Sequence, residues 1–125
     1  MRVNRLPKAA RLSGKKEIDL LFKSGKGKTF FPLKVLSLPK LHEVPDSRFE
    51  VLFTVSAKKY PKAVTRNRIK RLMREAFRLE QEPLLQIPPI LIAYIYIAPE
   101  VMPLAAIRIK MQESIRTLVK AHANA

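Results

Sequence analysis

Residues 90–97 form an uninterrupted apolar run with prolines on both sides of it. The run is apolar on both faces of a strand and far too short for a helix that spans a bilayer, so it predicts a central or well-covered β-strand. Tyr94 and Tyr96 share one face of this strand, and we expect them to be either buried or on the side of a cleft. A strand of this kind places a covered sheet at the centre of the fold.

Two segments closer to the N-terminus also predict strands. Residues 48–55 alternate, and four apolar side chains share one face: Phe49, Val51, Phe53 and Val55. This alternation is typical of a half-buried strand. Residues 30–38 are rich in strand formers, but Pro32 inside the run predicts an edge position or a bulge. We expect a turn at residues 25–28 and a polar loop at 41–47.

Two helices follow from helical spacing of apolar residues. Ser13 is a plausible N-cap for a short helix with Ile18, Leu21 and Phe22 on one stripe, and Gly25 is well placed to end it. The last helix carries its apolar residues at Ile107, Met111, Ile115 and Leu118. Between these helices, three prolines at positions 83, 88 and 89 are expected to stop any helix.

A third helix, which we call the basic helix, is predicted from Thr65 as N-cap to about Glu80. Its apolar stripe is Ile69, Leu72, Met73 and Ala76, and its opposite face carries Asn67, Lys70, Arg71, Arg74 and Arg78. Glu75 is the only acidic residue among these cations, and we expect it to pair with a neighbour at i±4 such as Arg71. One face should pack while the other meets phosphates.

The predicted element order is helix, strand, strand, basic helix, strand, helix. It predicts an α/β (α+β) two-layer sandwich and one domain over residues 1–125. Residues 1–12 carry four cations and no apolar period, so they are expected to form a mobile basic arm. Residues 121–125, which include His122, are expected to form a frayed tail.

The charge balance directs attention to polyanions. The chain has 25 Lys and Arg against 10 Asp and Glu, a formal net charge of +15. Nucleic acid is the first partner class that such a charge predicts, and an anionic membrane is the second. The chain has no cysteine, and residues 1–10 lack the apolar segment of a signal peptide. We therefore expect the interior of a bacterium or organelle, with the bacterial cytoplasm as first choice.

The inventory of catalytic side chains is thin. His42 and His122 have no carboxylate partner at a suggestive spacing, and the carboxylates are scattered apart from Glu80 and Glu82. No glycine-rich phosphate loop lies between a strand and a helix. We predict no catalytic residue, no metal ligand and no small-molecule cofactor for this chain, and any chemistry is expected to come from a partner.

The run from Lys58-Lys59 through Arg66-Asn67-Arg68 to Phe77 closely resembles the bacterial ribonuclease P protein family, whose hallmark is this RNR helix. The resemblance extends back to Thr54-Val55 and to Arg11-Leu12. It implies a central mixed sheet with three helices, in which a left-handed βαβ crossover carries the RNR helix. It also implies an RNA-binding subunit that assists a catalytic RNA in removing the 5′ leader from precursor tRNA, with Mg²⁺ bound mainly through that RNA.

The resemblance assigns two groups of residues, and the distribution of basic residues adds a third. The RNR face, Arg66, Asn67, Arg68, Lys70, Arg71 and Arg74, is expected to contact ribonuclease P RNA. Candidates for a cleft that holds the single-stranded leader of precursor tRNA are Phe22, Lys58 and Lys59. Additional basic contacts are Arg11, Lys62 and Arg78. The chain departs from its relatives at Ile18, where a second cleft aromatic is common, and at Ala98-Pro99, where an Ala-Arg pair is common.

Other interpretations stay open at this point. Phe22 shares a stripe with Ile18 and Leu21, so it could pack in the core instead of stacking on bases. A structural RNA-binding protein of the ribosomal type would share the charge and the small sandwich. A protein-only nuclease would use carboxylates such as Glu75, Glu80 and Glu82. Stimulation of cleavage by a catalytic RNA would distinguish the subunit from a structural RNA-binding protein. Cleavage of precursor tRNA without an RNA partner would indicate a protein-only nuclease.

Overall fold

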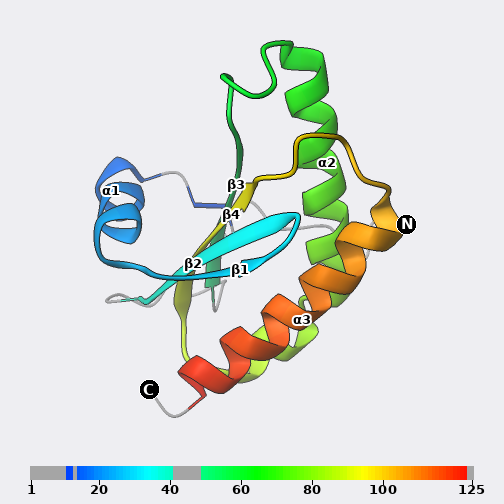
Figure 1. Ribbon diagram of the computed structural model, residues 1–125. Helices are drawn as coiled ribbons and strands as arrows, with labels where there is room; N and C mark the ends of the chain where they lie inside the picture. The colour runs from blue at the N-terminus through cyan, green and yellow to red at the C-terminus, as the bar shows by residue number, and fades with distance from the viewer. Residues whose placement is uncertain (1–10, 13, 41–48, 124–125) are drawn as a thin grey trace.

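The computed structural model describes residues 11–12, 14–40 and 49–123, and Figure 1 shows how their elements are arranged. In chain order these are α1 (Lys15–Ser24), β1 (Lys26–Phe30), β2 (Leu33–Pro39), β3 (Phe49–Val55), α2 (Ala63–Glu80), the 3₁₀-helix η2 (Glu82–Gln86), β4 (Ile90–Tyr96) and α3 (Leu104–His122). The α+β class, with three α-helices and a central mixed sheet, is confirmed.

The sheet has the strand order β1-β2-β4-β3, so the apolar strand β4 is central as predicted. It pairs antiparallel with β2 and parallel with β3. Because β3 and β4 are neighbours and parallel, the chain must cross from one end of the sheet to the other between them, and α2 lies in this crossover (Figure 1). The left-handed sense of the crossover stays a prediction from the resemblance.

Helices lie on both faces of the sheet. The larger core lies between the sheet and the two long helices, with Val35, Phe53 and Tyr94 from three strands packed against α2 and α3. On the other face, Leu21 of α1 packs in a smaller cluster with Leu36 and other side chains. Figure 1 shows α1 on the side of the sheet away from α2 and α3. The short helix α1 thus adds a partial third layer to the expected sandwich.

An aromatic cluster joins α2 to the sheet. The ring of Phe77 lies 5.4 Å from Phe49, 5.7 Å from Phe53 and 5.8 Å from Tyr94, centroid to centroid, in edge-on arrangements. The Tyr94 hydroxyl is 2.8 Å from the Oγ of Ser114 on α3, and burial raises the pKa of Tyr94. Tyr94 and Tyr96 are therefore buried, which is one of the two placements that the sequence left open.

The prediction for the first hairpin is wrong in two respects. Residues 26–30, expected to begin as a turn, form strand β1, whose side chains are mostly exposed. Pro32 predicted an edge position or a bulge for β2, but β2 is internal, because it lies between β1 and β4. Pro32 lies in the turn that precedes β2, so its missing N–H removes no bond from the sheet.

The helix ends differ from the sequence predictions. Helix α2 begins at Ala63 with Lys62 in the N-cap position, so Thr65 is not the cap. Ser13 lies outside the described residues, and Gly14 holds the N-cap position of α1. Gly25 ends α1 as predicted: its N–H donates to the carbonyl of Leu21, and a Cβ there would lie 2.3 Å from that oxygen. A 3₁₀-helix, η2, forms despite Pro83, because proline is tolerated in its first turn.

The segment Arg11-Leu12 is attached to the edge of the sheet. Arg11 forms a parallel bridge with Val51 of β3, the Leu12 N–H donates to the carbonyl of Val51 at 3.0 Å, and the Leu12 side chain is buried. The expectation of a mobile arm is therefore wrong for these two residues, because a backbone hydrogen bond and an apolar contact fix them. Residues 1–10 lie outside the described part of the chain.

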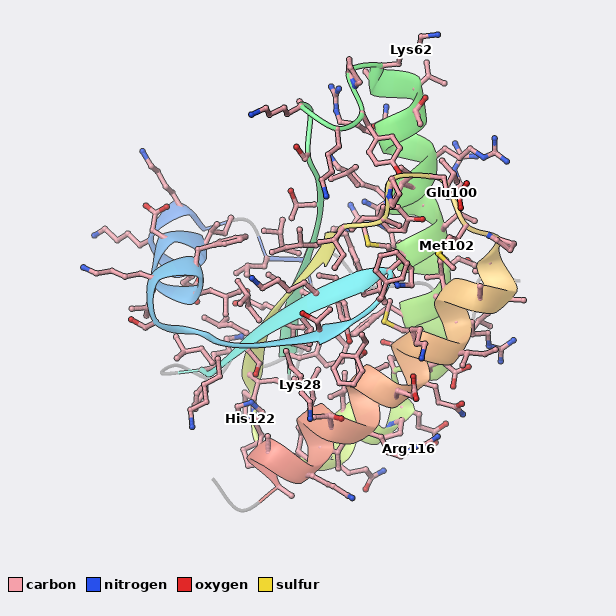
Figure 2. All side chains as sticks on the ribbon, viewed as in Figure 1. Lys28, Lys62, Glu100, Met102, Arg116 and His122 are labelled. Atoms are coloured by element: carbon pink, nitrogen blue, oxygen red, sulfur yellow. The ribbon has the colours of Figure 1, made fainter. Side chains whose placement is uncertain are left out.

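The C-terminal end of α3 is also fixed, contrary to the predicted frayed tail. The helix runs to His122, whose side chain is only 6% exposed. Its Nε2 lies 3.0 Å from the Oγ of Ser37 on β2, and Figure 2 shows His122 where α3 reaches the end of the sheet. The prediction of a frayed tail is wrong for residues 121 and 122, which belong to α3 and are held by the contact between His122 and Ser37. Residues 124 and 125 lie outside the described residues.

His122 predicts a loss of stability in mild acid. Burial, and to a lesser degree the charge of Lys26, lower its pKa below the ordinary value of 6.5. The contribution of neutral His122 is fully present above pH 6.5, and it is lost as the pH falls from there through the folded-state pKa, because only the unfolded chain gains the proton readily. We expect Tm to fall across this window, and a thermal melt at each pH measures it.

The matched variant is His122→Gln, which has no group that titrates in this range. Its Tm is expected to change less than that of the wild type below pH 6.5. The pKa of Glu75 is also lowered, but its stabilising effect is lost at more acidic pH, below its ordinary value of 4.5. Parallel Tm profiles of wild type and His122→Gln between pH 7 and 5 would contradict the assignment.

Candidate nucleic-acid interface

Helix α2 separates an apolar face from a cationic one, as predicted. Its fully buried side chains are Ile69, Met73, Ala76 and Phe77, while Leu72 is half-buried. Its exposed polar side chains include Asn67, Arg68, Arg71 and Arg74, and Lys70 is half-buried beside them. The buried stripe fixes the rotation of the helix, so the cations have to face away from the sheet core.

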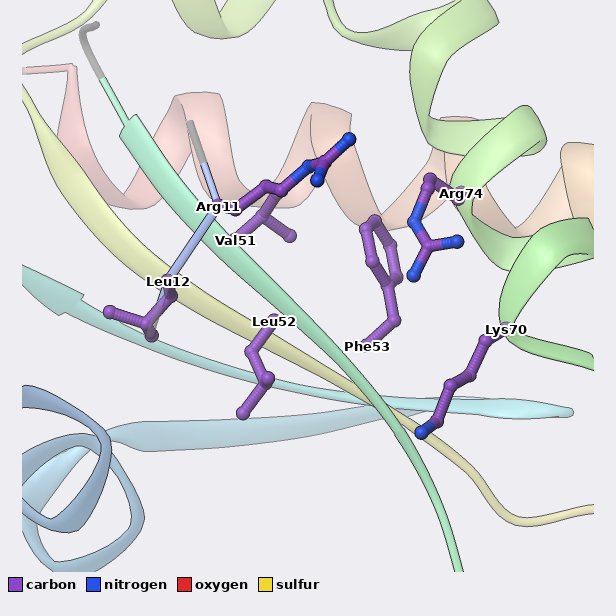
Figure 3. A pocket seen from close by; sticks show the side chains of 7 residues that line it. All are labelled: Arg11, Leu12, Val51, Leu52, Phe53, Lys70 and Arg74. Carbon is purple, nitrogen blue, oxygen red and sulfur yellow. The ribbon is translucent and has the colours of Figure 1, made fainter. Parts of the chain in front are cut away.

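A solvent-facing hollow of about 330 Å³ lies between the edge of β3 and the cationic face of α2. It is lined by Arg11, Leu12, Val51, Leu52, Phe53, Lys70 and Arg74. Figure 3 shows Arg11 reaching from the segment beside β3 toward Arg74 on α2, with Lys70 on the same helix. The hollow therefore combines cations from two parts of the chain that are distant in sequence.

The charge in this hollow is not neutralised locally. None of the described residues that line it is acidic. The guanidinium carbon of Arg74 lies 5.9 Å from the centroid of the Phe53 ring, and partial burial together with the charge of Arg11 lowers the pKa of Arg74. An anion placed here would relieve the repulsion between the two arginines, and phosphate suits their guanidinium groups.

Glu75 pairs with Arg78, not with Arg71 as expected. The Nε of Arg78 donates to Glu75 Oε2 at 3.1 Å, and a second contact joins Nη2 to Oε1. The hydrogen bond from Arg78 is the main cause that lowers the pKa of Glu75. This i,i+3 pair leaves Arg71 exposed and partly neutralises the charge of Arg78. Of these two predicted RNA contacts, Arg78 is therefore expected to attract a phosphate more weakly than Arg71.

The carboxylates that a protein-only nuclease would use are not gathered. Glu75 is paired with Arg78, and Glu80 accepts a hydrogen bond from the Nε of Arg108 on α3 at 2.6 Å. Among the described residues, no group of three His, Cys, Asp or Glu side chains is placed to hold a metal ion. The arrangement of these carboxylates favours ion pairs between helical side chains over an acidic reaction centre.

Two predicted RNA ligands make hydrogen bonds within the protein. Arg66 is half-buried, and its Nη1 donates to the carbonyls of Tyr60 and Pro61 at 2.8 Å each. The Nζ of Lys59 donates to the carbonyl of Ile97 at 2.9 Å. Lys58 and Lys62 are exposed, and Figure 2 shows Lys62 at the outer end of α2. The cations near the start of α2 thus divide into anchored and solvent-facing groups.

Phe22, the aromatic candidate for the cleft, is 45% exposed, so the alternative that it packs in the core does not hold. Leu21 is the residue of α1 that is fully buried. Phe22 lies on α1, which covers only part of one face of the sheet. Lys58 and Lys59 lie in the loop after β3. The structure therefore places the three candidates on two separate elements.

The described residues leave a strip of the sheet on the α1 side uncovered, and the sequence did not predict this strip. Strand pairing aligns Thr54, Ile95, Lys34 and Thr29 in one row across β3, β4, β2 and β1. All four are half-buried or exposed. The neighbouring row contains Ala93 and Leu36, which pack in the same cluster as Leu21 of α1. The sequence signal for the strip was weak, because Thr29, Lys34 and Thr54 are polar whereas Ile95 and the neighbouring Leu36 and Ala93 are apolar.

None of the helices in the described residues combines the length and the apolar character needed to cross a bilayer.

Residues 6–122 match the protein family described as Ribonuclease P. The chain is similar to the ribonuclease P protein component of Chlorobaculum tepidum, with 45% identity over 82 residues, which are 64% of this chain and 53% of that protein. The chain thus spans about half the length of the curated relatives that it matches.

Two solved structures share the fold. The RNase P protein of Staphylococcus aureus has a TM-score of 0.70 at 24% identity, over 92% of this chain and 99% of that chain. The RNase P protein from Thermotoga maritima has a TM-score of 0.70 at 23% identity, over 86% of this chain and 96% of that chain. At this level of identity the likeness concerns the arrangement of helices and strands.

Proposed function

The chain belongs to the ribonuclease P protein family, and on that premise we propose that it is the RNA-binding subunit of ribonuclease P in the bacterial cytoplasm. In this role it binds ribonuclease P RNA and the 5′ leader of precursor tRNA. The catalytic RNA then removes the leader by endonucleolytic cleavage. The protein contributes charge and shape to the complex, and it supplies no reacting group.

The observation that carries this proposal is the cationic hollow between β3 and α2. Arg11, Lys70 and Arg74 line it without an acidic neighbour among the described lining residues. Arginine can grip a phosphate through two parallel N–H bonds, and lysine adds a point charge. Together with the exposed Arg68 and Arg71, these side chains suit a folded RNA backbone better than a small anion, because they extend along the helix.

The leader is proposed to lie over the uncovered strip of the sheet, beside α1. Phe22 is exposed enough for a base to stack on its ring, and stacking on an aromatic face tolerates any base. Lys34 lies within the strip, and Lys59 is hydrogen-bonded to Ile97 just past the end of β4. These cations would follow the backbone of a single strand while the ring contacts a base.

The family implies Mg²⁺ in this reaction, and we propose that the RNA subunit holds it. The described side chains offer no group of three suitable donors, so this part of the chain does not fit a protein-held metal ion. Each protein cation that covers a phosphate replaces part of the counterion atmosphere of the RNA. The protein is therefore expected to lower the Mg²⁺ concentration that the RNA needs.

Cleavage of a 5′-extended precursor tRNA at low Mg²⁺ tests the function. We expect a bacterial ribonuclease P RNA alone to be slow, the protein alone to be inactive, and the two together to be fast. A second substrate with a one-nucleotide leader should gain less from the protein, because it cannot reach the strip. Binding without faster cleavage would indicate a structural RNA-binding protein, and cleavage by the protein alone would indicate a protein active site.

A further inference from the structure

We propose that Arg66, the first arginine of the RNR motif, is a positioning residue that holds the loop of residues 56–62 in place for RNA. We call this segment the lysine loop, because it carries Lys58, Lys59 and Lys62. In this role Arg66 acts through the lysines and is not itself the principal phosphate ligand. The inference rests on the proposed RNA-binding function and changes the role that the family resemblance gave to this arginine.

The hydrogen bonds of Arg66 carry the inference. Its Nη1 has two N–H groups, and both acceptors that it reaches are backbone carbonyls of the lysine loop, those of Tyr60 and Pro61, at 2.8 Å. A nitrogen engaged in this way has no N–H left for a phosphate. Arg68 and Arg71 differ, because both are exposed and neither makes an intramolecular hydrogen bond or ion pair within the described residues.

The two carbonyls accept no backbone hydrogen bond among those of the described residues. They precede α2. In the first turn of this helix, the backbone N–H of Arg66 donates a hydrogen bond to the carbonyl of Lys62 at 3.1 Å. The carbonyls of Tyr60 and Pro61 lie just outside this ladder, and Arg66 from the first turn of the helix reaches back to both. The guanidinium therefore fixes the angle at which the loop enters the helix.

Other contacts hold the rest of the lysine loop. The Oγ of Ser56 accepts from the N–H groups of Lys58 and Lys59 at 3.2 and 3.3 Å. The hydroxyl of Tyr60 donates to the buried carbonyl of Ala98 at 2.6 Å, which ties the loop to the segment after β4. With both ends fixed, the exposed side chains of Lys58 and Lys62 project from a defined backbone.

This geometry sets the consequence for binding. A lysine on a fixed backbone loses less conformational freedom when it contacts a phosphate than a lysine on a mobile loop. Loss of Arg66 should therefore weaken RNA binding mainly through Lys58 and Lys62. If Arg66 were an independent phosphate ligand, its loss would have the same effect whether or not those lysines were present.

The test is a double-mutant cycle on binding of a bacterial ribonuclease P RNA. We expect Arg66→Met to weaken binding by roughly tenfold in the wild-type protein and less than about twofold in a Lys58→Ala/Lys62→Ala background. Arg71→Met is the matched control, because it removes the same charge from the same helix and should act equally in both backgrounds. Equal effects of Arg66→Met in the two backgrounds would overturn the proposal.

A measurement on the free protein separates this inference from the proposed function. The Tyr60 N–H donates to the carbonyl of Ser56 at 3.0 Å within the loop, so its hydrogen exchange reports whether the loop is closed. We expect faster exchange at Tyr60 in Arg66→Met and no change in Arg71→Met. Unchanged exchange in Arg66→Met would overturn the positioning role even if RNA binds. A wild-type protein that fails to bind the RNA would instead count against the proposed function.

Discussion

Replacing Arg71 and Arg74 together by alanine is expected to weaken the association with ribonuclease P RNA and to reduce its dependence on salt. Both side chains are exposed on the cationic face of α2, and Arg74 also lines the hollow beside β3. If each covers one phosphate, the log-log salt slope should become shallower by roughly 1.4 to 1.8, since each phosphate contributes about 0.7 to 0.9. Filter binding or fluorescence titration over a series of salt concentrations measures this slope.

The matched control for this variant is Arg116→Ala/Lys120→Ala. It removes the same charge from exposed positions of α3, far along the chain from the hollow. A general loss of net charge would affect both double variants alike, whereas a specific contact affects only the α2 variant. A salt slope that stays at the wild-type value in Arg71→Ala/Arg74→Ala would refute the assignment of this face.

The largest effect on stability is expected for Phe77→Ala. Phe77 is fully buried, and its ring makes edge-on contacts with Phe49, Phe53 and Tyr94. Truncation of such a side chain costs about 3 to 5 kcal/mol, against a typical domain stability of about 5 to 15 kcal/mol. Urea-induced unfolding measures the difference, and we expect a substantial unfolded fraction at 37 °C.

Val64→Ala is the control on the same helix. Val64 is 81% exposed, and alanine is the better helix former, so its free energy of unfolding should change by no more than about 0.5 kcal/mol. If Phe77→Ala lost less than about 1 kcal/mol, the aromatic cluster would not be the element that joins α2 to the sheet. The folded fraction of Phe77→Ala should still bind RNA, since the cationic face itself is intact.

Segments with a strong hydrophobic pattern were predicted correctly from the sequence. The alternation of residues 48–55 and the apolar run of residues 90–97 correspond to β3 and β4. The basic helix ends at Glu80 as predicted, because its apolar stripe ends there. Strand β1 was missed because its residues, Lys-Gly-Lys-Thr-Phe, bury almost nothing, and its strand conformation comes from pairing with β2.

The contacts of several individual side chains could not be predicted from the spacing of residue types. Arg66 hydrogen-bonds to backbone carbonyls, which no side-chain pattern indicates. His122 packs against Ser37, a residue of a strand far earlier in the chain, so its position near the C-terminus suggested exposure. Glu75 had candidate cations at several helical spacings, and spacing alone did not distinguish Arg78 from Arg71.

The two edges of the sheet have a consequence for solubility. An open strand edge can pair with a strand of another molecule and start aggregation. Strand β1 carries Lys26 and Lys28 at one edge, and the other edge, β3, is bridged at Val51 by Arg11. Like charges on every copy make edge-to-edge pairing costly. The positive charge that supports the proposed RNA binding therefore also helps to keep the sheet from growing into a fibre when the protein is concentrated.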